Sequence, residues 1–211
     1  MKGSALNHAS GSHLGPRDSD ELTPLLELQL VEAYRDGDPD AMERLLRGYQ
    51  GRVYAVCYRM IRNPEIASDL AQDSMLRVIQ NLSSYDGRAK LSTWIIRVTM
   101  NCCFSHMRKQ KLRNHSSLDA IEESIGQMQR SGEPQPDDRI QQRQQSESVQ
   151  SAFQALDPDN RALLVLRDLQ GLDYQQIGEV FEIPVGTVKS RLFRARAALR
   201  EAVQMEQDQQ D

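Results

Sequence analysis

The sequence has few aromatic residues and no long apolar run. Aromatic residues make up 5% of its 211 residues, although 39% are hydrophobic and 27% are charged. No stretch reaches the roughly 18 consecutive apolar residues of a membrane-spanning helix, so we expect no membrane insertion. The first residues also lack the apolar core of a secretory signal peptide, and we therefore expect a cytoplasmic protein.

Cysteine and histidine are also scarce. The three cysteines, Cys57, Cys102 and Cys103, form no CxxC pair, so neither a zinc site nor a redox motif is predicted. We expect them to be buried thiols in a reducing compartment. The four histidines are scattered and accompany no nucleophile or ligand set. The sequence therefore offers no catalytic, cofactor-binding or metal-binding residues.

No segment alternates apolar and polar residues as a strand does. Instead, Thr23-Pro24, Asp38-Pro39 and Asn63-Pro64 each join a capping side chain to a proline at the first helical position. These pairs predict helices from about 24 to 35, 39 to 61 and 64 to 82. After a loop at 83–90, a fourth helix opens at residue 92 or 93 and runs to about 112. The predicted fold class is all-α.

A polar stretch containing Pro134 and Pro136 separates two groups of predicted helices. We expect a flexible linker at 114–147 between a helical bundle at 23–113 and a smaller helical domain at 148–202. Residues 1–22 are expected to be disordered, and residues 203–211 to form a polar, frayed tail.

The second domain ends in two predicted helices around a tight turn. Asp173 and Gln176 have the spacing of a capping box, and Pro184 is placed to open the next helix. That helix carries five cations and no acid between 189 and 200. The pair predicts a helix-turn-helix whose second helix enters a DNA major groove, although an ordinary hairpin with a solvated basic face is the alternative. The residues expected to contact DNA are Thr187, Lys189, Ser190, Arg191, Phe193, Arg194 and Arg196.

The predicted helix 64–82 has an acidic face opposite its apolar face. Glu65, Asp69 and Asp73 recur every four residues there, although like charges at this spacing destabilise a helix by roughly a few tenths of a kcal/mol. Leu76 and Gln72 lie among them. A solvated face is one interpretation, and a docking surface for a basic protein, with Leu76 as an apolar anchor, is the one we favour.

The segment from residue 88 to residue 113 carries seven cations and no acid. Arg97, Asn101 and Arg108 share one side of its predicted helix, next to Trp94. Guanidinium and amide groups beside an aromatic ring suit contacts with phosphates and unstacked bases. Burial of Trp94 in the core is the alternative.

Three strings resemble one family. DLAQDSMLRV is similar to region 2.2 of bacterial sigma factors, SYDGRAKLSTWIIRVTMN to regions 2.3 and 2.4, and GLDYQQIGEV with PVGTVKSRLFRARAALR to region 4. The similarity is to the extracytoplasmic-function (ECF) group of the sigma-70 family and covers about 25–113 and 148–200. It implies an alternative sigma factor that binds core RNA polymerase, directs promoter-specific transcription initiation, and is not an enzyme.

The resemblance also assigns roles to individual residues. The polymerase β′ coiled coil would bind Asp69, Gln72, Asp73 and Leu76, and the second domain would dock on the β flap. The loop at 83–92 would capture a flipped base, at a cost of a few kcal/mol. The promoter −10 element would be contacted by Tyr85, Arg88, Lys90, Trp94, Arg97, Asn101 and Arg108. The helix from 187 would read the −35 element, and an anti-sigma factor is an implied partner.

Two positions depart from the family pattern. Leu156-Asp157-Pro158 has one residue more than the usual Leu-Pro, and Glu182 stands where glycine is common in the helix-turn-helix turn. If the turn needs a positive φ there, Glu182 costs about 1 kcal/mol.

Two other classes of protein fit parts of the sequence. A helix-turn-helix regulator that dimerises or senses a ligand would explain 171–200 but not the acidic helix. A nuclease could use Asp69 and Asp73 for a metal ion, but no third ligand is apparent in the sequence.

Overall fold

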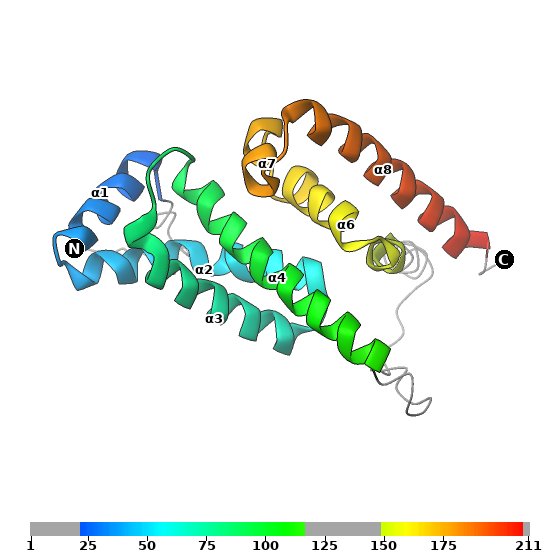
Figure 1. Ribbon diagram of the computed structural model, residues 1–211, viewed down its shortest axis with the longest axis horizontal. Helices are drawn as coiled ribbons and strands as arrows, with labels where there is room; N and C mark the ends of the chain where they lie inside the picture. Colours follow the sequence, from blue (N-terminus) through cyan, green and yellow to red (C-terminus); the bar gives the residue numbers. More distant parts are fainter. Residues whose placement is uncertain (1–21, 117–148, 209–211) are drawn as a thin grey trace, which may run out of the picture.

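The structure, a computed structural model, describes residues 22–116 and 149–208, and within these ranges it contains helices and no strand (Figure 1). The predicted all-α fold is therefore confirmed. The segment expected to be disordered lies outside the described residues except for Leu22. So does the expected linker, apart from its first three residues, which continue a helix.

The first three helices begin where the capping pairs predict. They are α1 (Pro24–Arg35), α2 (Pro39–Ile61) and α3 (Pro64–Asn81). The side chains of Thr23, Asp38 and Asn63 accept hydrogen bonds from backbone N–H groups of the first turns, at 3.3, 3.0 and 3.0 Å. Each proline fills a position whose N–H would have no partner within the helix.

The fourth helix is longer than the sequence predicts. A 3-10 turn, η1 (Leu82–Ser84), follows α3, and α4 runs over Leu91–Ser116. It starts before Ser92 because the Trp94 N–H already bonds to the Lys90 carbonyl at 3.0 Å. It also passes the expected end at 112. Cations in its last turns interact favourably with the negative end of the helix dipole, which offsets the weak apolar pattern there.

The first bundle packs α3 and α4 against α2, with α1 across one end (Figure 1). Its core contains fully buried side chains from α2, η1 and α4: Leu45, Val53, Met60, Leu82, Leu91, Ile95, Ile96 and Met100. Each contributes about 1.5–3 kcal/mol by leaving water. The three cysteines are buried free thiols, as predicted, and the sulfurs of Cys57 and Cys103 lie 3.9 Å apart.

One buried polar pair ties α1 to α2. Glu27 is 8% exposed and accepts a hydrogen bond from the Tyr49 hydroxyl. Burial, followed by the bond to Glu27, raises the pKa of Tyr49 above its usual value. The pair satisfies two groups that would otherwise be costly to bury.

The second domain contains helical residues 149–155, α6 (Pro158–Leu164), a π-helical turn η2 (Val165–Leu169), α7 (Tyr174–Phe181) and α8 (Val185–Asp208). Asp157 caps α6 by accepting from the N–H groups of Asp159 and Asn160 at 3.1 and 3.0 Å. The helix α8 continues through 203–208, where we predicted a frayed tail. It begins one residue after Pro184, whose carbonyl accepts from Val188 N at 3.1 Å.

The two domains lie against each other. Figure 1 shows α7 beside α4, and the second domain as a layer over the first. No helix in the described part of the chain is both long and apolar enough to cross a membrane.

Candidate nucleic-acid interface

The turn between α7 and α8 is fixed by capping at both ends of α7. Asp173 Oδ1 accepts from Gln176 N at 2.8 Å, and Gln176 Oε1 accepts from Asp173 N at 2.9 Å, so the predicted capping box is present. The helix ends at Phe181, and the next residue, Glu182, has φ 56° and ψ 42°. The positive φ that we expected to cost about 1 kcal/mol is therefore observed.

Glycine is required in this turn at Gly178. A Cβ there would lie 2.8 Å from the Ile183 carbonyl oxygen, too close for any side chain. The same glycine carbonyl accepts from the Ile183 N–H at 3.0 Å, which closes the turn. The close approach of α7 to the following residues sets the angle at which α8 leaves.

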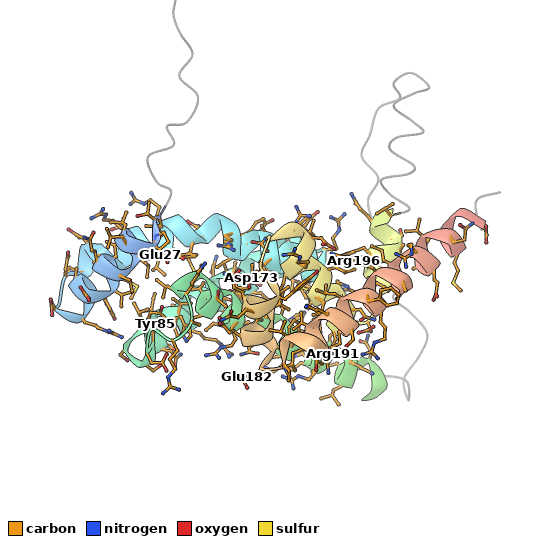
Figure 2. All side chains as sticks on the ribbon, turned by 90° about the horizontal axis from the view of Figure 1, so that it is seen from above. Glu27, Tyr85, Asp173, Glu182, Arg191 and Arg196 are labelled. Carbon is orange, nitrogen blue, oxygen red and sulfur yellow. The ribbon has the colours of Figure 1, made fainter. Side chains whose placement is uncertain are left out.

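The predicted DNA-contacting face of α8 points to solvent. Val188, Leu192 and Ala195 are buried on the opposite side, as their spacing predicts. Figure 2 shows Arg191 and Arg196 along α8. Phe193 is 72% exposed, which is unusual for a large aromatic side chain. Of the other predicted residues, Thr187 and Arg191 are half-buried, while those with exposed side chains are Lys189, Ser190, Arg194 and Arg196.

Arg196 already has a partner within the domain. Its Nη2 lies 2.6 Å from Asp168 Oδ1, and its Nε lies 3.4 Å from the other carboxylate oxygen. The hydrogen bond to Asp168 raises the pKa of Arg196. Arg196 therefore joins α8 to η2, and DNA would have to share it with Asp168.

A second cation of α8 rests on an aromatic ring. Lys189 Nζ lies 5.9 Å from the centroid of Tyr174, and the Arg167 guanidinium lies 4.8 Å from the same centroid. Such cation–π contacts hold a cation in place without neutralising it. Sequence reasoning missed Tyr174 and Arg167, although a tyrosine at the first position of α7 was visible.

The two aromatic residues predicted to contact the −10 element are buried. Tyr85 and Trp94 are 5% and 8% exposed, and their ring centroids lie 5.6 Å apart. The Tyr85 hydroxyl donates to the Ala89 carbonyl at 2.6 Å, and Arg35 Nη2 donates to the Tyr85 carbonyl at 2.5 Å. Tyr85 is the first residue of the loop between η1 and α4, where Figure 2 labels it. The alternative placement of Trp94 in the core is correct, and the supporting role of Arg35 was missed.

The polar residues predicted for the −10 element are spread over that loop and α4. Arg88 and Lys90 are exposed on the loop, and the Arg88 side chain pairs with Asp86 at 3.2 Å. Asn101 and Arg108 are exposed on α4. Arg97 is different, because its Nη1 lies 3.4 Å from Glu182 Oε1 in the second domain.

The predicted docking face of α3 is exposed as a whole. Asp69, Gln72 and Asp73 face solvent, and Leu76 is 55% exposed among them. A groove of about 730 Å³ runs beside this face between α2 and α3, lined by Leu46, Tyr54, Ala71, Gln72 and Met75 among others. The α2 side of this groove was not predicted. Among the described residues, no group of three or more His, Cys, Asp or Glu side chains could hold a metal ion.

Comparison with known proteins gives two family matches. The model described as Sigma-70 region 2 matches residues 45–113, and the model described as Sigma-70, region 4 matches residues 146–199.

Curated relatives are similar over most of their length. The chain is 33% identical to the ECF RNA polymerase sigma factor SigW of Bacillus subtilis over 174 residues, covering 81% of this chain and 92% of that protein. It is 31% identical to the ECF RNA polymerase sigma-E factor of Escherichia coli K12, covering 85% of this chain and 95% of that protein.

Two solved structures share the fold. The sigma factor RpoE in complex with the anti-sigma factor NepR, from Bartonella quintana, has a TM-score of 0.59 at 22% identity and covers 77% of this chain and 96% of that chain. CnrH in complex with the cytosolic domain of CnrY has a TM-score of 0.57 at 19% identity and covers 89% of this chain and 99% of that chain.

Proposed function

Because this chain belongs to the ECF group of the sigma-70 family, we propose that it is an alternative sigma factor that binds core RNA polymerase and directs promoter-specific transcription initiation. The observation that carries this proposal is the exposed cationic face of α8 on a helix-turn-helix, together with a separate acidic face on α3. Sigma factors are initiation factors, and we assign RNA synthesis to the polymerase and no catalytic residue to this chain. We place its action in the cytoplasm, where the polymerase works.

Domain 148–202 is proposed to read the −35 element and to dock on the β flap. The helix α8 has the width of a major groove, and its exposed arginines can bind phosphates or guanine edges. Phe193 offers an apolar surface that can contact a thymine methyl group. Its large exposure, which costs hydrophobic stabilisation in the free protein, supports a role in binding.

Domain 23–113 is proposed to melt and hold the −10 element. The exposed Arg88, Lys90, Asn101 and Arg108 would contact the backbone and the extruded base. Tyr85 and Trp94 would act by fixing the loop to the core, because both rings are buried and pack on each other. The hydrogen bonds from Arg35 and to Ala89 hold this loop at two points, which reduces the entropy that DNA binding must remove.

The α3 face is proposed to bind the β′ coiled coil of the polymerase. Acidic side chains around an exposed leucine fit a basic helical partner with an apolar contact at its centre. The groove beside α3 gives such a partner a second wall from α2. An anti-sigma factor is a further proposed partner, since the structural relative RpoE was solved with the anti-sigma factor NepR.

The test is in vitro transcription with purified core polymerase and a library of promoters. We expect specific initiation that requires both the chain and the polymerase. Asp69→Lys with Asp73→Lys should abolish association with core polymerase, whereas Glu32→Lys, an exposed acid on α1, should leave it unchanged. Undiminished binding of the doubly reversed variant, or a palindromic footprint made by the chain alone as a dimer, would contradict the proposal.

A further inference from the structure

The helix-turn-helix packs against the helix that is proposed to read the −10 element. The Phe181 ring at the end of α7 lies 6.1 Å from the Phe104 ring of α4, at an interplanar angle of 57°. One residue further on, the Glu182 carboxylate forms the ion pair with Arg97 at 3.4 Å. An aromatic contact and an ion pair therefore bring the turn of one domain onto the DNA-binding side of the other.

A second set of contacts joins the domains at the end of α2. Arg161 of α6 donates to the Met60 carbonyl at 2.7 Å, and Gln154 Nε2 donates to the Arg59 carbonyl at 3.3 Å. The last carbonyls of a helix have no partner within it, and a positive charge is favourable there. The second domain thus caps a helix of the first.

Glu182, which forms this ion pair, has a backbone conformation that is unfavourable for glutamate. Glu182 has a φ of 56°, a conformation that glycine adopts without cost and that a Cβ disfavours. Its side chain is 79% exposed, so burial does not explain a glutamate at this position. The contact with Arg97 gives the carboxylate a role that glycine could not supply.

We propose that α7 and its turn are an intramolecular ligand of α4, in which the Glu182 carboxylate occupies the Arg97 guanidinium that the −10 phosphate backbone would otherwise bind. This inference rests on the proposed function. A carboxylate and a phosphate bind guanidinium in the same way, so the two compete for Arg97. Phe193 and Arg194 stay exposed in the same arrangement. The closed chain therefore presents its −35 surface while it withholds part of its −10 surface.

The contact between the two domains is of a kind that can separate. At its other end a solvent-open pocket of about 290 Å³ lies between α2 and the second domain, lined by Arg59, Arg62, Phe153 and Leu169 among others. The contacts at this end are mostly hydrogen bonds of polar side chains. Polar junctions between domains permit relative motion. Binding of each domain to its own site on the polymerase would supply the force for opening.

The distance between the domains tests the inference in the free, full-length chain. Spin labels at Gln80→Cys and Met205→Cys would report it, since both positions are exposed and the native cysteines are buried. We expect a narrow closed distance for the parent protein. Glu182→Gln should lower the ratio of closed to open molecules by about two- to fivefold, the effect of one exposed ion pair.

Glu179→Gln is the matched control. It removes a carboxylate of α7 that accepts a hydrogen bond from Gln175 Nε2, in the same helix, at 3.4 Å. This substitution should leave the fraction of closed molecules unchanged. Exchanging the charges, Arg97→Glu with Glu182→Arg, should restore the closed distance that either single reversal loses. Equal closed fractions in Glu182→Gln and Glu179→Gln, or no restoration by the exchange, would overturn the inference.

A binding measurement separates this inference from the proposed function. The probe is a labelled single-stranded oligonucleotide carrying the −10 element selected in the transcription assay. Glu182→Gln should bind it about two- to fivefold more tightly than the parent, with unchanged binding to a −35 duplex. Unchanged −10 affinity in a variant that still initiates transcription would contradict the intramolecular ligand alone. Loss of polymerase binding by the parent protein would contradict the proposed function, while the distances would still be measured.

Discussion

At the scale of single residues, two glycines offer a matched test of the helix-turn-helix. Gly178→Ala places a Cβ 2.8 Å from the Ile183 carbonyl, whereas a Cβ at Gly186 meets nothing within 4 Å. We expect Gly178→Ala to destabilise the protein by about 1–3 kcal/mol. Gly186→Ala, in the first turn of α8, should be neutral or stabilising by up to about 1 kcal/mol. Urea denaturation measures both. Equal midpoints for the two variants would show that the turn can relax.

Tyr174 should affect DNA binding without affecting the fold. Tyr174→Leu removes the ring that holds Lys189 and Arg167. We expect weaker binding to a −35 duplex and a salt dependence of log K that is shallower by up to about 0.9, the loss of one phosphate contact. Tyr54→Leu is the control, because Tyr54 is a partly exposed tyrosine of α2 stacked on Tyr58. An unchanged salt dependence of log K would show that Tyr174 does not position Lys189 for binding.

The buried Tyr49 predicts how stability depends on alkaline pH. Burial raises the pKa of Tyr49 above 10.0, so the folded state keeps the proton that the unfolded chain releases. The contribution of the Tyr49 phenol to the free energy of unfolding is present below about pH 10 and is lost as pH rises beyond that value. At pH 7, Tyr49→Phe should lower the free energy of unfolding, measured by urea denaturation, by about 1–3 kcal/mol, because Glu27 loses its buried partner. It should also lose less stability than the parent between about pH 9 and pH 11, since it has no phenol to titrate.

Two residues show where sequence reasoning fails at this scale. The family resemblance assigned Tyr85 and Trp94 to −10 contacts, with burial of Trp94 in the core as the other interpretation, and the two rings pack on each other. A helical wheel places Trp94 next to Arg97, but it cannot show that Tyr85, from the loop before α4, packs on the Trp94 ring. The exposed Leu76 and Phe193 were placed correctly, since each stands opposite a complete apolar stripe of its own helix.

At the scale of elements, the sequence predicted the starts and ends of α1, α2 and α3 to within one residue, but it did not predict where α4 and α8 end. A start has a local signal, a capping side chain before proline, and all three such pairs begin helices. The ends of α4 and α8 lie beyond the predicted positions, because polar helical residues give no apolar period to follow. The π-helical turn η2 also has no signature in the sequence.

The capping box of α7 gives a prediction for an element. Asp173→Ala removes the acceptor of the Gln176 N–H and leaves the first turn of α7 with an unpaired donor. We expect a loss of about 1 kcal/mol, and Asp173→Asn should retain most of the stability, because asparagine caps about as well as aspartate. Thermal denaturation of the three proteins tests this. A fully stable alanine variant would mean that packing alone fixes the start of α7.

At the scale of the whole molecule, the order of the two domains followed from sequence patterns, and their contact did not. The apolar periods identify each bundle separately. The contacts between them join residues far apart in the chain, such as Arg52 Nε with Gln170 Oε1 at 3.1 Å, and no local pattern marks such a pair. The positive φ of Glu182 was anticipated from its place in the turn, but its ionic partner was not.

The guanidinium of Arg161 has a consequence for heating. It donates to the carbonyls of Gln154 and Leu156 in its own domain and to Met60 in the other. Melting of the second domain would therefore remove a hydrogen-bond donor from the end of α2 at the same moment. A calorimeter should record one endotherm whose van't Hoff and calorimetric enthalpies agree for the free chain, and Arg161→Met, which weakens the coupling between the halves, should lower the ratio of the van't Hoff to the calorimetric enthalpy.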